Sequence, residues 1–133
     1  MTILRVLESC LYATDLVAAE TFYRDVLGLS VYARVPERHV FFRCGQGMFL
    51  VFNPQRTAIA SGDVPTHGAH GPGHVAFAID PAVIPMWRER LQAYRVAIET
   101  EITWPGGGRS LYFRDPAGNS VELATPQTWA YDE

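Results

Sequence analysis

The sequence predicts an α+β fold made of two pseudo-symmetric βαβββ modules. The main reason is an internal repeat, in which residues 22–27 (FYRDVL) resemble 86–91 (MWRERL), and residues 40–47 resemble 111–118. The second reason is that both copies place a helix-like segment between apolar, strand-like segments in one shared order. Since neither half is large enough for a good core alone, the 133 residues are expected to form a single domain.

The first module, about residues 1–56, begins with a predicted strand over 3–13. Asp15 is a suitable N-cap for a helix that runs to about Leu27, and Gly28 favours its C-terminal end. Three more strands are predicted because β-branched and aromatic residues cluster between turn residues; they cover 30–34, 39–43 and 48–53.

The second module, about residues 73–126, follows a predicted linker over 57–72. Pro, Gly, Ser, Thr and His dominate the connecting region, so we expect a mobile loop there. The module begins with a strand over 74–79 and a helix from Asp80 to about Tyr94. Three strands follow near 96–101, 109–114 and 120–125, and Gly118 supplies the positive φ of a tight hairpin between the last two.

Composition and charge narrow the range of functions. With 48% hydrophobic and 19% charged residues, the chain is typical of a globular domain. The formal net charge is −3 and no basic run occurs, which argues against partners such as nucleic acid or an anionic membrane surface. No segment has transmembrane length, and no signal-peptide pattern precedes the first strand. Cys10 and Cys44 are too few for a disulfide framework, so we expect a cytoplasmic protein.

Three isolated polar residues lie in apolar strands, at matching places in the repeat. They are Glu8, His74 and Glu122. A carboxylate in an apolar strand is costly to bury unless something pairs with it, so three such residues suggest a shared divalent metal ion. Because side chains alternate along a strand, each of the three lies on the less bulky face, as in the lining of a cleft. The alternative to a metal site is that His74 is a structural histidine and that the two glutamates lie at solvent-exposed strand edges.

Several long segments resemble the vicinal oxygen chelate superfamily, which includes glyoxalase I, extradiol dioxygenases, fosfomycin-resistance enzymes and bleomycin-resistance proteins. The resemblance covers nearly the whole chain and is clearest in 13–29 (ATDLVAAETFYRDVLGL), 73–79 (GHVAFAI) and 108–123 (GRSLYFRDPAGNSVEL). It implies paired modules whose mixed sheet curls into a cleft containing one divalent metal per chain. It also implies a small-molecule substrate and a homodimer.

The same resemblance implies metal ligands on the first and last strand of each module, which fall on Glu8, Val51, His74 and Glu122. Val51 comes from a gapless match of residues 40–52 with 111–123, and it cannot bind a metal. A four-ligand glyoxalase I site is therefore not expected. The remaining set of one histidine and two carboxylates suits Mn²⁺, Fe²⁺, Zn²⁺, Ni²⁺ or Mg²⁺.

Further candidate site residues lie beside these ligands. Ser110, Tyr112 and Arg114 share one strand face, and we expect Tyr112 to contact a substrate hydroxyl or donate a proton. Tyr112 and Glu122 are the candidate catalytic residues, and Arg109 or Arg114 is a candidate anion contact. The alternatives are cross-strand packing for the tyrosine and surface ion pairs for the arginines.

Two other features of the sequence have alternative interpretations. Cys10 shares a strand face with Glu8 and is either a substrate contact or a packing residue. His67 and His70 lie in the loop over 54–73, where they are either lid residues or solvated.

These observations favour a metal-dependent enzyme that chelates a small oxygen-rich substrate: a lyase, an isomerase or a fosfomycin-resistance-type transferase. Two alternatives stay open. One is an extradiol-type dioxygenase, and the other is a metal-free binding protein of the bleomycin-resistance type.

Overall fold

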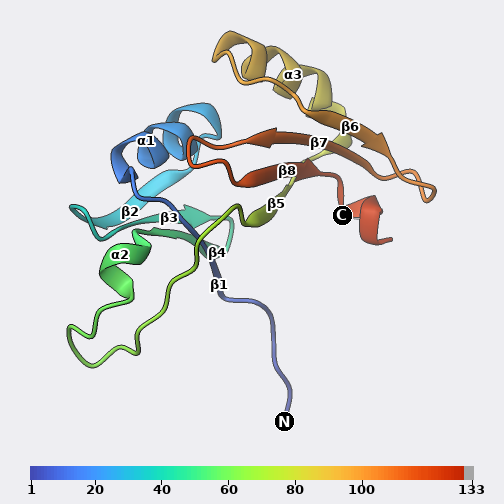
Figure 1. Cartoon of the computed structure of the whole chain (residues 1–133). Helices are drawn as coiled ribbons and strands as arrows, with labels where there is room; N and C mark the ends of the chain where they lie inside the picture. Colours follow the sequence, from blue (N-terminus) through green and yellow to red (C-terminus); the bar gives the residue numbers. More distant parts are fainter. Residues whose placement is uncertain (131–133) are drawn as a thin grey trace. The chain divides into compact units, whose positions relative to one another are not determined.

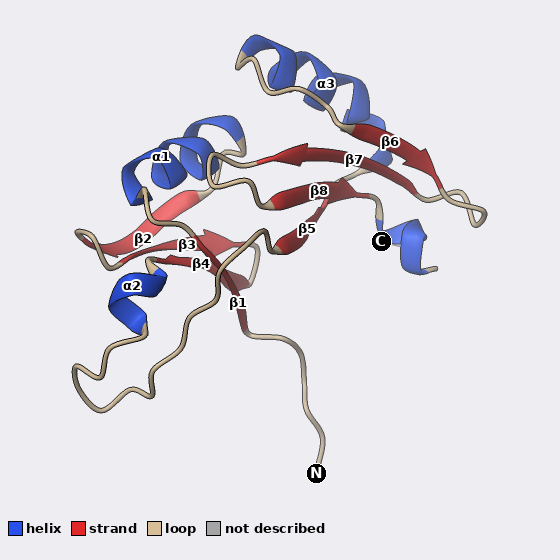
Figure 2. Cartoon of the chain, viewed as in Figure 1, coloured by secondary structure: helices blue, strands red, loops and turns tan. Residues whose placement is uncertain are grey.

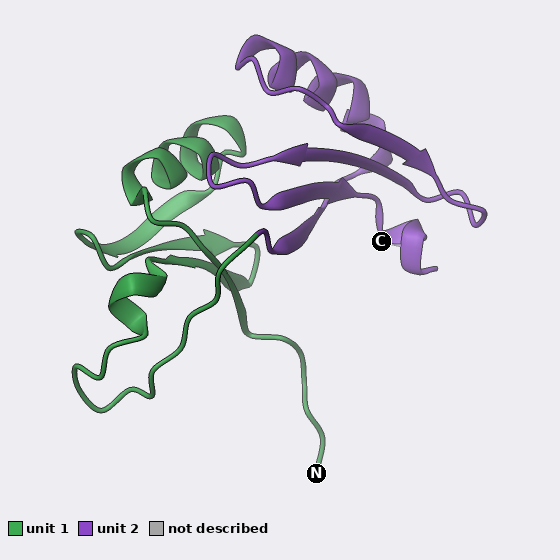
Figure 3. Cartoon of the chain, viewed as in Figure 1, with its two compact units in different colours: residues 1–71 green, residues 72–133 purple. Residues whose placement is uncertain are grey.

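The computed structural model describes residues 1–130, which fall into two compact units. Unit 1 is Met1–Gly71 and unit 2 begins at Pro72 (Figure 3). Each unit contains one four-stranded mixed sheet, with strand order β1-β4-β3-β2 in unit 1 and β5-β8-β7-β6 in unit 2. The two orders are identical in topology, so the predicted α+β fold with two repeated modules is confirmed.

Unit 1 follows the predicted order of elements (Figure 1). Its elements are β1 (Glu8–Tyr12), α1 (Leu16–Thr21) with a π-helical continuation (Phe22–Val26), β2 (Ser30–Val35), β3 (His39–Cys44), β4 (Gly47–Phe52) and α2 (Pro54–Thr57). The Asp15 side chain accepts a hydrogen bond from the Ala18 N–H at 3.0 Å, as expected of an N-cap. Gly28 ends the helix with φ 76°.

The core of unit 1 lies between its helix and one face of its sheet. Tyr23 is fully buried there, with its ring centroid 5.8 Å from Phe42 and 4.8 Å from Phe49. Because side chains alternate along a strand, Phe41 and Leu50 point to the opposite face. The opposite face of the sheet is therefore not covered by α1.

Two predictions for unit 1 were wrong in extent. The first strand is Glu8–Tyr12 rather than 3–13, because β1 pairs only with β4 and its first partner residue is Met48. The segment after β4 is also more ordered than the predicted loop. Asn53 caps α2 through its side chain, Thr57 is buried, and the Thr57 carbonyl accepts a hydrogen bond from the His67 N–H at 3.0 Å.

Unit 2 repeats the pattern (Figure 2). Its elements are β5 (His74–Ala78), a 3-10 turn (Pro81–Val83), α3 (Ile84–Ala93), β6 (Thr100–Thr103), β7 (Arg109–Arg114), β8 (Ser120–Ala124) and a last 3-10 turn (Pro126–Trp129). Within the described residues, no helix has the length and apolar character needed to cross a membrane.

The helix of unit 2 starts as its sequence predicts. Asp80 caps the 3-10 turn through the Ala82 N–H at 2.8 Å, and the proline in α3 lies in the first turn. Ile84 and Leu91 are buried in the core. Strand β6 starts at Thr100 rather than near residue 96, since Arg95 adopts φ 58° and turns the chain after the helix.

The two final hairpins differ in length by one residue, and this corrects the position of Val51. Arg43 pairs with Met48 across residues 44–47, whereas Arg114 pairs with Ser120 across residues 115–119. Phe41 pairs with Leu50 as Tyr112 pairs with Glu122, so the counterpart of Glu122 is Leu50. The gapless alignment was therefore wrong by one position.

Candidate metal centre

The site in unit 2 is formed by the parallel strands β5 and β8. His74 pairs in register with Ser120, and Ala76 pairs with Glu122. The strand pairing brings together two side chains that are 48 positions apart, with His74 Nε2 lying 3.3 Å from Glu122 Oε1. His74 is half exposed and Glu122 is 7% exposed, so the pair has one open side and one buried side.

A backbone carbonyl fixes the protonation pattern of the His74 ring. Nδ1 lies 3.1 Å from the Ser120 carbonyl oxygen, which can only accept, so Nδ1 donates. A neutral His74 therefore has its lone pair on Nε2, the nitrogen beside Glu122. This arrangement is typical of a metal-binding histidine, in which the second ring nitrogen donates to a carbonyl.

A chain of three hydrogen-bonded side chains holds the glutamate. Trp104 Nε1 donates to Ser110 Oγ at 2.9 Å, and Ser110 Oγ donates to Glu122 Oε2 at 2.5 Å. An indole N–H can only donate and a carboxylate oxygen can only accept, so the direction of both bonds is fixed. Glu122 is thus held as an acceptor, with Oε2 bound by the serine and Oε1 directed to His74.

Tyr112 completes the polar face of unit 2. Its ring stacks on His74 with a centroid distance of 6.4 Å and an interplanar angle of 22°. Burial, followed by the negative charge of Glu122, raises the pKa of the Tyr112 hydroxyl above its usual value. The hydroxyl is therefore protonated at neutral pH and acts as a hydrogen-bond donor.

The spacing of His74 and Glu122 fits shared coordination of one ion. Two ligands about 2.1 Å from one metal lie about 3.0–3.4 Å apart, and the observed Nε2–Oε1 distance is 3.3 Å. Among the residues described in unit 2, no third His, Cys, Asp or Glu joins this pair. The predicted third ligand, Glu8, belongs to unit 1, and its participation stays a prediction.

The unit 1 sheet has a face that corresponds to the polar face of unit 2, and its residues at the positions equivalent to Glu122 and Tyr112 are apolar. Glu8 is exposed at the start of β1, opposite Met48. Leu50 is the counterpart of Glu122, and Phe41 that of Tyr112. Leu50 lines a pocket of about 930 Å³ on this face and Val51 does not; Val51 is 1% exposed on the same side of β4 as Phe49. The prediction that Val51 faces the cleft as the counterpart of Glu122 was therefore wrong, because the counterpart of Glu122 on β4 is Leu50.

Three further predicted site residues, Arg114, Arg109 and Cys10, lie outside the His74–Glu122 pair. Arg114 binds Glu99 through two nitrogens at 3.2 Å and the Gly118 carbonyl at 3.1 Å. Arg109 is exposed on β7, and Cys10 lines the pocket of unit 1. Their substrate roles stay predictions.

The two loop histidines differ from one another. His67 Nδ1 lies 2.6 Å from the Tyr12 hydroxyl, and its ring is 4.6 Å from that of Phe52. His67 is thus a wall of the unit 1 pocket rather than a solvated residue, whereas His70 is exposed.

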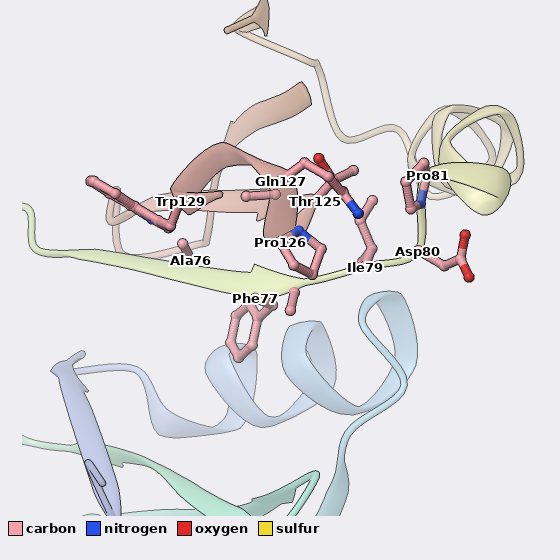
Figure 4. A pocket seen from close by; sticks show the side chains of 11 residues that line it. Ala76, Phe77, Ile79, Asp80, Pro81, Thr125, Pro126, Gln127 and Trp129 are labelled. Carbon is pink, nitrogen blue, oxygen red and sulfur yellow. The ribbon is translucent and has the colours of Figure 1, made fainter. Parts of the chain in front are cut away.

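Unit 2 has a pocket of about 740 Å³ between the end of β5 and the last 3-10 turn (Figure 4). Phe77, Ile79, Pro126 and Trp129 are among its walls. Its acidic residue, Asp80, is the N-cap of the following turn, so this pocket does not contribute a metal-binding group.

Two repeated βαβββ units, with a histidine and a glutamate on neighbouring parallel strands, define a glyoxalase-type domain. Residues 2–123 match the family described as the Glyoxalase/Bleomycin resistance protein/Dioxygenase superfamily. The chain belongs to this superfamily.

Solved structures agree with this assignment. The chain is 44% identical to a lactoylglutathione lyase from Agrobacterium tumefaciens, with a TM-score of 0.91 over 96% of this chain and 97% of that one. It is 25% identical to a glyoxalase/bleomycin resistance protein/dioxygenase from Nocardioides, with a TM-score of 0.73 over 94% and 85% of the two chains. A fosfomycin resistance protein from Listeria monocytogenes shares the fold at 19% identity, with a TM-score of 0.71 over 96% and 99%.

Sequence reasoning missed His39 and Arg38 as pocket residues. Arg38 Nη1 lies 2.8 Å from His39 Nδ1, and the His39 ring stacks on Phe41 with centroids 4.0 Å apart. The available signal was the alternation along β3, since His39, Phe41 and Arg43 share a face just as Ser110, Tyr112 and Arg114 do on β7.

Proposed function

We propose that this protein is a divalent-metal-dependent enzyme that binds a small oxygen-rich substrate through neighbouring oxygen atoms. His74 and Glu122 are two of the ligands and Glu8 is the third. The observation that carries the proposal is the His74 ring, whose Nδ1 donates to the Ser120 carbonyl while Nε2 lies 3.3 Å from Glu122. A bound divalent ion would supply a Lewis acid that stabilises negative charge on a substrate oxygen.

The protein's own residues have separable roles in this proposal. Ser110 keeps Glu122 oriented, because its hydroxyl hydrogen is committed to Oε2. Tyr112, protonated at neutral pH, donates a hydrogen bond or a proton to a substrate oxygen beside His74. Arg109 is the better candidate for an anion contact, because Arg114 is paired with Glu99.

A lyase or isomerase reaction is the favoured chemistry, since the 44% identical relative is called a lactoylglutathione lyase. In glyoxalase I the ligand on the last strand of the first module is a glutamate, and the strand register gives Leu50 as the corresponding residue here. We therefore expect weak turnover of the glutathione–methylglyoxal adduct by this protein. Rapid turnover would show that the glutamate is dispensable.

A metal-free binding protein is the second candidate. The hydrogen bonds from Trp104 to Ser110 and from Ser110 to Glu122 satisfy one oxygen of the buried carboxylate without any ion, and His74 Nε2 lies 3.3 Å from the other. This candidate predicts that purified protein contains no metal and that added metal does not raise its melting temperature.

Elemental analysis and thermal melting of the purified protein test the proposal. We expect about one divalent ion per chain, and a melting temperature that falls on chelation and recovers with Mn²⁺, Zn²⁺ or Ni²⁺. His74→Ala should lose the ion under mild chelation. His70→Ala is the matched control, because His70 is an exposed histidine of the loop. If the wild-type protein neither contains nor responds to metal, the proposal is wrong.

A further inference from the structure

The pocket of about 930 Å³ in unit 1 has a composition unlike that of the candidate metal centre. It lies on the face of the β1-β4-β3-β2 sheet opposite α1. Its apolar walls include Tyr12, Tyr32, Phe41, Met48, Leu50 and Phe52. Such a lining suits a flat apolar group.

Six of the fourteen lining residues carry aromatic or imidazole rings, and several of these rings contact one another. The His39 and Phe41 rings are parallel, with centroids 4.0 Å apart and an interplanar angle of 6°. Phe52 meets Phe41 edge-on at 5.5 Å and His67 edge-on at 4.6 Å. Both stacked and edge-on surfaces are therefore present for a further ring.

Hydrogen bonding fixes the state of His39. An arginine can only donate, so Arg38 Nη1 donates to His39 Nδ1 at 2.8 Å, and the neutral ring has its proton on Nε2. Burial, followed by the charge of Arg38, lowers the pKa of His39. The pocket thus contains a neutral imidazole with one N–H donor.

Two arginines give the pocket a positive balance. Arg38 and Arg43 line it, and Glu8 is the only carboxylate in its lining. Among the described residues, neither arginine forms an ion pair, whereas the guanidinium groups of Arg24, Arg34, Arg56, Arg88 and Arg114 all do. Arg43 instead lies over the Tyr32 ring, 4.5 Å from its centroid.

We propose that the unit 1 pocket binds an aromatic anion: a flat ring system that packs among Phe41, Phe52 and Leu50, with an acidic substituent that pairs with Arg38 or Arg43. Aromatic rings bind in pockets that offer stacked and edge-on partners, and an unpaired guanidinium favours a carboxylate or sulfonate. The assignment rests on the proposed function and deepens it, because Glu8, the proposed third metal ligand, lines the same pocket. It names the class of substrate that this pocket would hold, and the pocket's lining residues all belong to unit 1.

Isothermal titration calorimetry with two probes tests this proposal. The probes are 1-naphthoate and the uncharged 1-naphthalenemethanol, both in EDTA so that the result does not depend on a bound metal ion and can fail separately from the proposed metal binding. We expect one 1-naphthoate per chain, with affinity about tenfold above that of the alcohol. Phe41→Ala should weaken both probes about tenfold, since it removes the stacking surface. Combining Arg38→Gln with Arg43→Gln should weaken 1-naphthoate alone.

Control variants separate binding from folding. Phe41→Leu keeps an apolar side chain and should lose affinity while retaining the wild-type melting temperature. Tyr94→Ala removes a half-exposed aromatic ring outside the pocket and should bind normally. Saturating 1-naphthoate should also slow alkylation of Cys10, which lines the pocket. Absence of saturable binding, equal affinity for the two probes, or loss of binding in Tyr112→Ala but not in Phe41→Ala would overturn the proposal.

Discussion

Glu122 illustrates how neighbouring residues determine what one side chain can do. It is 7% exposed, and an isolated carboxylate so deeply buried would be costly. Trp104 donates a hydrogen bond to Ser110, and Ser110 donates one to Glu122 Oε2, which offsets that cost. Oε1 stays beside His74. The isolation of Glu122 in an apolar strand was visible in the sequence. The serine was recognised as sharing a face with Tyr112, but its bond to Glu122 depends on cross-strand register, which the sequence did not specify.

Replacing Ser110 by Ala should weaken metal retention without removing a ligand. Loss of a hydrogen bond that orients a ligand typically costs about 10–100-fold in metal affinity. Metal titration in a competing chelator measures the change. Ser120→Ala is the control, because its backbone carbonyl still accepts from His74. Equal affinities for the two variants would contradict the orienting role of Ser110.

His39 should make the protein sensitive to mild acid. Its folded pKa is lowered by burial and by Arg38, so the unfolded chain binds a proton that the native protein resists. The free energy of unfolding should therefore fall as pH drops through the ordinary histidine range toward the lowered folded pKa. Between pH 7.5 and 5.5, the melting temperature of His39→Gln should decrease less than that of the wild type, whereas His70→Gln should behave like the wild type.

Among the elements, the hairpins show where sequence reasoning succeeded and where it failed. The β3–β4 and β7–β8 strands were predicted from alternation and turn residues, and both are present. Their relative register was not predictable from a gapless match, because a turn can gain one residue while the strand pairing is kept. Because the turn at 115–119 has one extra residue, Leu50 rather than Val51 is the counterpart of Glu122 in the repeat.

Substituting glutamate for Leu50 or for Val51 should have different effects on stability and metal binding. Leu50→Glu puts a carboxylate on the pocket face of β4, where we expect a folded protein with tighter metal binding. Val51→Glu buries a charge on the helix side and should reduce the free energy of unfolding by about 3 kcal/mol or more. Thermal melting and metal titration of both variants measure these effects. Similar stability of the two variants would contradict the observed register.

The β6–β7 hairpin depends on one glycine. A Cβ at Gly108 would lie 2.4 Å from Thr128 Cα, and backbone cannot move aside cheaply. Gly108→Ala should therefore cost about 1–3 kcal/mol of stability by denaturant unfolding. Gly106→Ala, whose Cβ would approach nothing closer than the Gln127 carbonyl oxygen at 3.9 Å, should cost less than half as much.

Across the whole molecule, one topology has two different chemical linings. The repeat and its βαβββ order were predictable because hydrophobic periodicity records them directly. The aromatic pocket of unit 1 was not, since His39 and Arg38 become significant only through contacts across strands and loops. The order of the segment after β4 was not predicted either, because it depends on the contact of His67 with Tyr12, two residues 55 positions apart.

The assembly predicted from the sequence is a homodimer with twofold symmetry. Residues Ile3, Leu4, Val6 and Leu7 are all more than half exposed, an apolar surface that a partner chain would cover. Light scattering at micromolar concentration should report twice the monomer mass of 14.8 kDa. Ile3→Lys with Val6→Lys should shift the protein toward monomer, and a monomeric wild type would refute the prediction.

The position of β5 at the end of its sheet has a consequence for motion. Within the order β5-β8-β7-β6, this strand is hydrogen-bonded to β8 alone, whereas β8 is held on both sides. An outer strand detaches at lower free energy than an inner one, so β5 can open locally while the rest of the unit stays folded. His74 would then leave and return with each opening, while Glu122 stays fixed. The ion-binding pair therefore joins an outer strand of unit 2 to an inner one, and an ion held between them would suppress this local opening.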